Sequence, residues 1–180
     1  TITWCQEILK SSKRFRAIVV NSGNANACTG PKGMEDCKSL ASKLSQKLAV
    51  EPKEILIAST GIIGVPLPIN KIVKALPALS SKLSPIGWVS SAEAIMTTDL
   101  TPKFKSLSFY IGKDKITMGG IAKGSGMIHP NMATMLAFIA TDAAIDKKTL
   151  GRALREANNK TFNRITVDGD TSTNDMAILL

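Results

Sequence analysis

Short apolar runs rich in β-branched residues alternate along the chain with longer segments in which apolar residues recur at helical spacing. The first kind of segment predicts buried strands, and the second predicts amphipathic helices. The strand-like segments are residues 16–20, 55–58, 107–111, 115–121, 135–141, 165–167 and 177–180. The helix-like segments are residues 34–48, 69–83, 90–98 and 147–159. Together they indicate a mixed fold of the α/β or α+β class.

Local signals refine several of these expected elements. Pro77 is expected to kink or restart its helix, because proline cannot donate the backbone hydrogen bond of a helix interior. Ser90 is expected to cap the next helix, with Glu93 three residues later closing a capping box. Residues 107–111 and 115–121 predict a hairpin around a Gly-Lys-Asp turn.

The composition is that of a folded protein. The chain has 180 residues, of which 44% are hydrophobic and 21% charged, and this excludes disorder as its main state. The length fits one domain over residues 1–180. The longest apolar stretches, such as residues 135–140, are too short to cross a bilayer, so no membrane partner is expected. The chain closes on an apolar run with no polar ending, which suggests a piece of a longer protein.

Charge and cysteine content narrow the classes of function. The formal net charge is +9, but the lysines are spread along the chain and few aromatic residues are available to stack on bases. A solvated basic surface is therefore preferred to a nucleic-acid site. One histidine and three separated cysteines give no metal-ligand spacing, so no metal is expected. The odd cysteine count indicates free thiols in a reducing compartment, either the bacterial cytoplasm or a mitochondrial matrix.

Three glycine-bearing turns follow predicted strands, at residues 21–27, 59–64 and 119–127. Glycine lets the backbone approach a ligand there, although none of the three matches a phosphate loop and spacing alone favours tight turns. Residues 168–175 are rich in oxygen ligands but depart from the calcium-loop template, which leaves a capped polar loop. His129 is the one imidazole available to a catalytic triad, and a lone histidine is more often structural.

Five longer segments carry the most specific signal. They read VVNSGNANACTG at 19–30, STGIIG at 59–64, IMTTDLTPK at 95–103, KGSGMIHPNMATMLAF at 123–138 and TVDGDTSTND at 166–175. In this order they resemble the arginine-biosynthesis ornithine acetyltransferases, also called bifunctional glutamate N-acetyltransferases. The resemblance covers nearly the whole chain. It implies a layered sandwich of sheets flanked by helices, similar to that of self-processing N-terminal-nucleophile enzymes.

The resemblance implies a threonine enzyme that cleaves itself. Family precursors break the bond between the residues that are Ala133 and Thr134 here, which would divide the chain into an α part, 1–133, and a β part that begins at 134. Thr134 then becomes the nucleophile, and its freed α-amino group, with an unperturbed pKa of ~7.7–8.0, becomes the base. The small side chain of Ala133 leaves room for the Thr134 hydroxyl to attack the preceding carbonyl.

The resemblance also assigns roles to four residues outside the cleavage site. The Thr60 hydroxyl and the Gly61 backbone N–H are expected to form the oxyanion hole, in which losing one donor costs on the order of 10²–10³ in rate. Thr97 and Lys123, besides Thr134, are expected to bind the substrate, because a lysine suits the carboxylate of an amino acid. From spacing alone, Thr60 and Gly61 would form an ordinary turn at the end of a strand. Thr97 would be a hydroxyl at the end of a helix, and Lys123 would be a surface lysine.

The implied reaction is ping-pong acyl transfer. Thr134 takes acetyl from N2-acetyl-L-ornithine and passes it to L-glutamate, and some relatives also accept acetyl-CoA. Neither a metal nor an organic cofactor is implied. The cleaved α and β chains are expected to assemble as a heterotetramer of two each. Family members are longer than this chain, with a further N-terminal segment and a C-terminal half that supplies more substrate contacts.

Two alternatives remain open. A related N-terminal-threonine amidase or peptidase would cleave itself in the same way but use another acyl donor. A non-enzymatic module would bind nucleic acid through its basic surface, with an affinity that depends strongly on salt.

Overall fold

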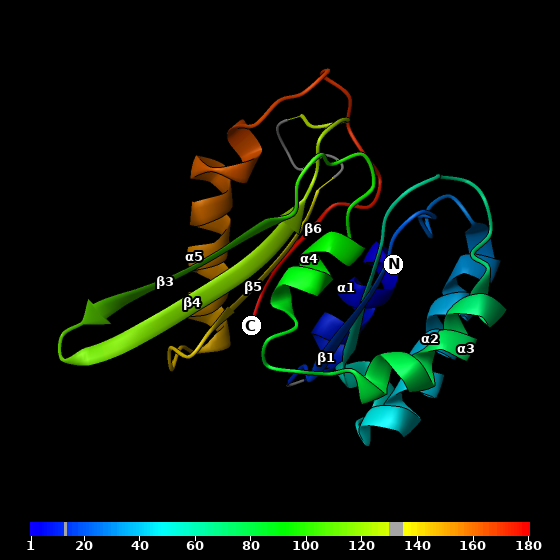
Figure 1. Cartoon of the computed structure of the whole chain (residues 1–180), viewed down its shortest axis with the longest axis horizontal. Coiled ribbons are helices and arrows are strands. Elements are labelled where there is room, and N and C mark those ends of the chain that lie inside the picture. Colours follow the sequence, from blue (N-terminus) through cyan, green and yellow to red (C-terminus); the bar gives the residue numbers. More distant parts are fainter. Residues whose placement is uncertain (13, 130–134) are drawn as a thin grey trace. The chain divides into compact units, whose positions relative to one another are not determined.

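The computed structural model describes residues 1–12, 14–129 and 135–180 of the chain. Its backbone contacts divide it into two compact units, Thr1–Gly87 and Trp88–Leu180 (Figure 1). Each unit contains one sheet with at least one helix packed against it. The mixed α/β class expected from the sequence is therefore confirmed, whereas the division into α and β parts at 133–134 remains a prediction.

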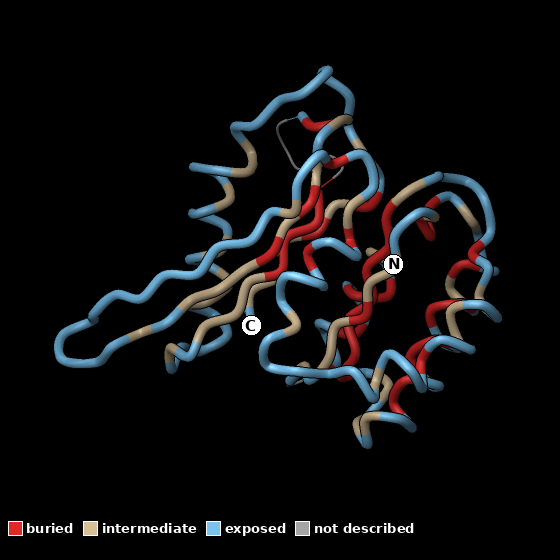
Figure 2. The backbone as a smooth tube through the Cα atoms, viewed as in Figure 1, coloured by how far each residue is buried: buried red, intermediate tan, exposed pale blue. Residues whose placement is uncertain are grey.

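The first unit is built on two parallel strands. In chain order its elements are α1 (Ile2–Ser11), β1 (Ala17–Asn21), α2 (Gly30–Leu48), the 3-10 turn Pro52–Glu54, β2 (Ile55–Ser59) and α3 (Ile69–Ser81). β1 and β2 pair from Ala17 opposite Ile55 to Asn21 opposite Ser59, so both strands end at the same edge of the sheet. Every residue of β2 is buried. Figure 2 shows this burial as the red stretch of tube at the centre of the unit.

The helices of this unit follow the apolar pattern of the sequence. α2 buries Leu40 and Leu44, which lie one turn apart on its inner face. α1, which the sequence analysis did not anticipate, is anchored by Trp4, whose indole Nε1 donates to the Ile55 carbonyl at 3.1 Å. Pro77 lies inside α3, which runs as one helix and is not restarted there. Proline is tolerated because α3 is mostly exposed and water can bond to the carbonyl that loses its partner.

The second unit is built on a four-stranded sheet. Its elements are α4 (Trp88–Ala94), β3 (Lys103–Ile111), β4 (Asp114–Lys123), β5 (Leu136–Thr141), α5 (Lys147–Lys160), the 3-10 turn Phe162–Arg164 and β6 (Met176–Leu179). The strand order is β3-β4-β5-β6, with two antiparallel pairings followed by a parallel one. α4 packs against β3 and β4. The core lies along β5, where Leu136, Ala137 and Phe138 are buried (Figure 2).

Three local expectations for this unit need adjustment. The predicted hairpin is present but longer, since β3 and β4 pair from Lys103 opposite Ala122 to Ile111 opposite Asp114. Ser90 is not a cap, because α4 begins at Trp88 and Ser90 lies within it. Residues 165–167 do not form a strand; only Val167 pairs, in an isolated bridge to Ile128. Among the described residues, no helix is both long and apolar enough to span a membrane.

Candidate functional site

The first candidate region is the turn that follows β2 in the first unit. Because β1 and β2 are parallel, the turn at Thr60 lies beside the turn that follows Asn21. The Thr60 N–H donates to the Asn21 carbonyl at 3.0 Å, and the Ile62 N–H donates to the Gly23 carbonyl at 3.3 Å. Thr60 is buried. Two loops that are distant in sequence are thus joined backbone to backbone at one edge of the sheet.

Gly61 is where these two loops approach most closely. Its φ of +126° is a conformation that side chains disfavour, and a Cβ there would lie 2.2 Å from the Gly23 carbonyl carbon and 2.5 Å from the Asn24 nitrogen. The sequence analysis expected glycine here to admit a ligand. In the structure, its lack of a side chain first of all admits the neighbouring loop, which holds the Thr60–Gly61 peptide in a fixed orientation.

The same edge is reinforced beneath the turn. Ser59, fully buried at the end of β2, accepts a hydrogen bond from the Asn26 N–H at 2.8 Å. Asn26 in turn donates through Nδ2 to the Gly33 carbonyl at 2.8 Å. These bonds tie the glycine turn to the start of α2. A rigid turn with fixed backbone N–H groups is the kind of element from which oxyanion holes are built.

The second candidate region is a side-chain pair in the second unit. Lys123, the last residue of β4, is only 3% exposed, and its Nζ donates to Thr97 Oγ1 at 2.9 Å. Thr97 follows α4 and is exposed. The structure therefore brings together two residues, 26 positions apart, that the family resemblance assigns to substrate binding. A buried ammonium beside an exposed hydroxyl can bind an anionic oxygen.

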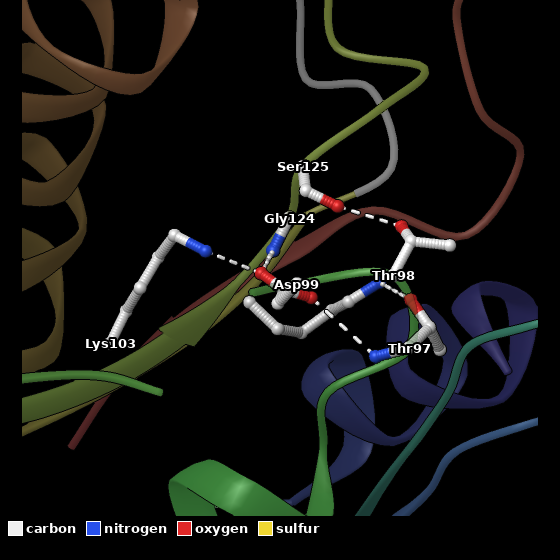
Figure 3. A network of polar contacts seen from close by, with 7 residues as sticks. Thr97, Thr98, Asp99, Lys103, Gly124 and Ser125 are labelled. Carbon is white, nitrogen blue, oxygen red and sulfur yellow. Dashed lines mark hydrogen bonds and ion pairs between the residues drawn. The ribbon is translucent and has the colours of Figure 1, made fainter. Parts of the chain in front are cut away.

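Asp99 lies at the centre of this region and was missed in the sequence analysis. Its Oδ1 accepts hydrogen bonds from the Gly124 N–H at 2.8 Å and from the Lys103 ammonium, and its Oδ2 lies 3.5 Å from the Thr97 N–H (Figure 3). The neighbouring hydroxyls of Thr98 and Ser125 are hydrogen-bonded to each other at 2.7 Å. The signal for Asp99 in the sequence was its place inside the motif at 95–103, two residues after Thr97.

The environment shifts the titration of both ionisable groups. Burial lowers the pKa of Lys123; the charges of Asp99 and Asp175 act in the opposite direction, and Lys103 adds to the lowering. For Asp99, burial alone would raise the pKa, but the hydrogen bonds from Lys103 and Gly124 outweigh it, so its pKa is lowered. Asp99 therefore stays ionised at neutral pH and supplies negative charge next to a buried cation.

Two carboxylates of the polar loop at 166–175 bind backbone on either side of residues 130–134. Asp168 Oδ2 accepts from the Met127 N–H at 2.9 Å, and Asp175 Oδ1 accepts from the Met135 N–H at 2.8 Å. This is a more specific role than the capped polar loop expected from the sequence.

Ala133 and Thr134, the predicted cleavage pair, lie outside the described residues. His129 is exposed.

Within the ranges that the structure describes, no three histidine, cysteine or acidic side chains are grouped so that they could hold an ion. All three cysteines are free, with Cys5 and Cys37 buried and Cys28 exposed. The two candidate regions present hydroxyl groups, an ammonium, a carboxylate and backbone N–H groups.

Solved structures with the same fold define the class of the protein. The crystal structure of the arginine biosynthesis bifunctional protein ArgJ from Bacillus halodurans matches with a TM-score of 0.65 and 35% identity, over 73% of this chain and 69% of that one. The ornithine acetyltransferase of Mycobacterium tuberculosis, solved in complex with ornithine, matches with a TM-score of 0.60 and 32% identity, over 72% and 69% of the two chains. The mixed α/β fold is thus one found in acetyltransferases.

Sequence relatives make the assignment specific. The model of the ArgJ family matches residues 1–180, and the chain belongs to this family. It is 53% identical, over 93% of its length, to the arginine biosynthesis bifunctional protein ArgJ of Caldanaerobacter subterraneus, and 54% identical, over 92%, to that of Symbiobacterium thermophilum. The chain spans about 41% of the length of these relatives. The family resemblance read from the five motifs is therefore confirmed.

Proposed function

We propose that the protein is a glutamate N-acetyltransferase of arginine biosynthesis, which moves acetyl from N2-acetyl-L-ornithine to L-glutamate. The observation that carries the proposal is the match to the ArgJ family over residues 1–180. The name of the M. tuberculosis neighbour, an ornithine acetyltransferase complexed with ornithine, supports the substrate class. The hydrogen bond between Lys123 and Thr97 supports it further, because this pair suits the carboxylate that all four amino-acid substrates and products carry.

In the proposed mechanism Thr134 is the nucleophile. Its hydroxyl oxygen attacks the acetyl carbonyl of acetylornithine and passes its proton to the Thr134 α-amino group. The resulting oxyanion accepts hydrogen bonds from the Thr60 hydroxyl and the Gly61 N–H. When the intermediate collapses, the C–N bond breaks and ornithine leaves with that proton on its amine. Glutamate then attacks the acetyl ester through its own amine, and the Thr134 hydroxyl is restored.

The α-amino base would arise by self-cleavage. The Thr134 hydroxyl attacks the Ala133 carbonyl, the acyl group moves from nitrogen to oxygen, and water hydrolyses the ester. This yields an α part that ends at Ala133 and a β part that begins at Thr134. We further propose that two parts of each kind assemble into a heterotetramer, that the enzyme works in the cytoplasm or a mitochondrial matrix, and that acetyl-CoA is an additional donor.

Intact-mass analysis tests the processing step. The expressed protein should separate into two pieces divided before Thr134, whereas the Thr134→Ala variant should remain one uncut chain. A wild-type chain that stays uncut while folded would contradict self-processing.

Incubation with acetylornithine and glutamate tests the transfer. Release of ornithine together with formation of N-acetylglutamate supports the proposal. Self-cleavage without either product would favour an amidase or peptidase that uses another acyl donor.

A further inference from the structure

The Asp99 carboxylate connects the two chain segments that carry the Lys123–Thr97 pair. Its side chain is 0% exposed. Its hydrogen-bond donors come from both segments: Gly124 directly follows Lys123, and the Thr97 N–H belongs to the residue whose hydroxyl Lys123 binds. Figure 3 shows Asp99 between the labelled Gly124, Thr97 and Lys103.

We propose that Asp99 is a positioning residue, which holds the Thr97 hydroxyl and the Lys123 ammonium together as one preformed site for a carboxylate. The proposal rests on the proposed function insofar as that site receives an amino-acid substrate. Asp99 itself touches no substrate in this account. It acts through the two residues that do.

The geometry gives this role a physical basis. Lys123 ends β4 and is fixed by the sheet, but Thr97 lies in the segment between α4 and β3, outside any regular element. The hydrogen bonds that Asp99 accepts from the Thr97 and Gly124 N–H groups fix that segment against the end of β4. Without these bonds, the Thr97 hydroxyl would no longer be held next to Lys123. Ligand binding would then have to order the loop, which would lower the affinity.

Charge gives a second basis. Among the described groups, the charges that act on Lys123 are those of Asp99 and Asp175, which favour its protonated form, and that of Lys103, which disfavours it. Lys103 forms an ion pair with Asp99 and has a side chain that is 46% exposed. Removing Asp99 should therefore shift the titration of Lys123 to lower pH. Removing Lys103 should shift it to higher pH.

These opposite signs show that Asp99 and Lys103 act on Lys123 through charge, and the Kd of ornithine separates positioning from a merely structural role. A carboxylate that only stabilised the fold would change the free energy of unfolding and leave the Kd of ornithine unchanged in the folded variant. Asp99→Asn keeps one acceptor for the Gly124 N–H and removes the charge. Lys103→Met removes the exposed partner and keeps both backbone bonds. Thr97→Val removes the acceptor for Lys123 and keeps Asp99.

The experiment uses the whole chain labelled with ¹³C at lysine Cε, with Lys123→Met to assign the Lys123 signal. The pH titration of that signal is recorded by NMR for the wild type and the three variants, and the Kd of ornithine is measured by calorimetry. We expect the Lys123 titration to move to lower pH in Asp99→Asn and to higher pH in Lys103→Met. The Kd of ornithine should rise about 10- to 100-fold in Thr97→Val, the range for losing a hydrogen bond to a charged group. It should also rise in Asp99→Asn, because Asp99 holds Thr97 and Lys123 in place.

An unmoved Lys123 titration in folded Asp99→Asn would overturn the inference. If Asp99→Asn does not fold, Lys103→Met decides, and an unmoved or lowered titration there would have the same consequence. The proposed function would be contradicted if the wild-type protein did not bind ornithine, or if Lys123→Met bound it as tightly as the wild type. In either case the Lys123 titration would still test the role of Asp99. Binding that is lost in Lys123→Met but unchanged in Asp99→Asn would refute the positioning role alone.

Discussion

The two candidate regions are held in place by different kinds of interaction. The glycine turn of the first unit is held by backbone bonds at Thr60 and Ile62 and by the absence of a side chain at Gly61. The pair in the second unit is held by side chains and charge, with Lys123 and Asp99 both buried. The difference predicts their sensitivities: the first region should respond to added volume and hardly to pH, and the second to charge and pH.

The largest expected effect follows from adding volume at the turn. Gly61→Ala places a methyl group against the backbone of Gly23 and in a strained conformation, so it should lower the free energy of unfolding by about 3 kcal/mol. The measurement is a urea titration followed by Trp4 fluorescence, in a Trp88→Phe background so that only the first unit reports.

Gly64→Ala is the matched control for that change. Gly64 also has a positive φ, +80°, but a Cβ there meets nothing within 4 Å. It should therefore cost only the conformational strain, about 1 kcal/mol. An equal loss of unfolding free energy in Gly61→Ala and Gly64→Ala would show that the close approach of the two loops does not make Gly61 more sensitive to an added side chain.

Removing the buried cation should weaken ligand binding. Lys123→Met is expected to raise the Kd of ornithine about 10- to 100-fold, because the carboxylate loses its charged donor. Lys71→Met, which removes an exposed lysine of the first unit, is the charge-matched control and should bind like the wild type. Weakening of the same size in both variants would point to overall charge in place of a specific contact.

The stability of the second unit should depend on pH through Lys123. Burial lowers its pKa from the usual 10.5, so at pH values between the two the unfolded chain binds more protons than the folded one. The free energy of unfolding should therefore rise with pH across that window in the wild type, and less so in Lys123→Met. Trp88 fluorescence in a Trp4→Phe background provides the readout. An identical slope in both proteins would contradict a perturbed Lys123.

The smallest expected effect is a change of stability with pH in the first unit. It arises from a carboxylate, Glu54, whereas the effect in the second unit arises from an ammonium. Hydrogen bonds from the Glu51 N–H and the Arg14 side chain hold the pKa of Glu54 below its ordinary 4.5. Its contribution to stability is present above that value and is lost as the pH falls through the lowered pKa. Glu54→Gln should be less stable than the wild type at neutral pH, with the difference shrinking in acid. A constant difference down to low pH would reject the ion pair as its cause.

The fold was predictable where local pattern and tertiary packing agree. The strand now seen as β2 was expected from its apolar run, and α2 from its leucine spacing, because burial of those residues decides both elements. α1 was missed because its stability depends on Trp4 and Cys5 bonding to a strand some fifty residues away. Ser90 was misread because a capping pattern also occurs inside helices.

The site was predictable residue by residue but not as an arrangement. Motif resemblance indicated Thr60, Gly61, Thr97 and Lys123, and their substrate and oxyanion roles remain predictions. The contact of Gly61 with Gly23 depends on the register of two parallel strands, which a single sequence does not reveal. The role of Asp99 depends on the path of the chain between α4 and β3, for which local pattern carries no signal.

The most direct test of the account is to trap the acetylated enzyme. The protein is incubated with acetylornithine without glutamate, digested, and the position of any added acetyl group is found by tandem mass spectrometry. We predict one acetyl group on the hydroxyl of Thr134, at the N-terminus of its peptide, and its disappearance when glutamate is added. An acetyl group that stays after glutamate is added, or that resides on a lysine in place of Thr134, would contradict it.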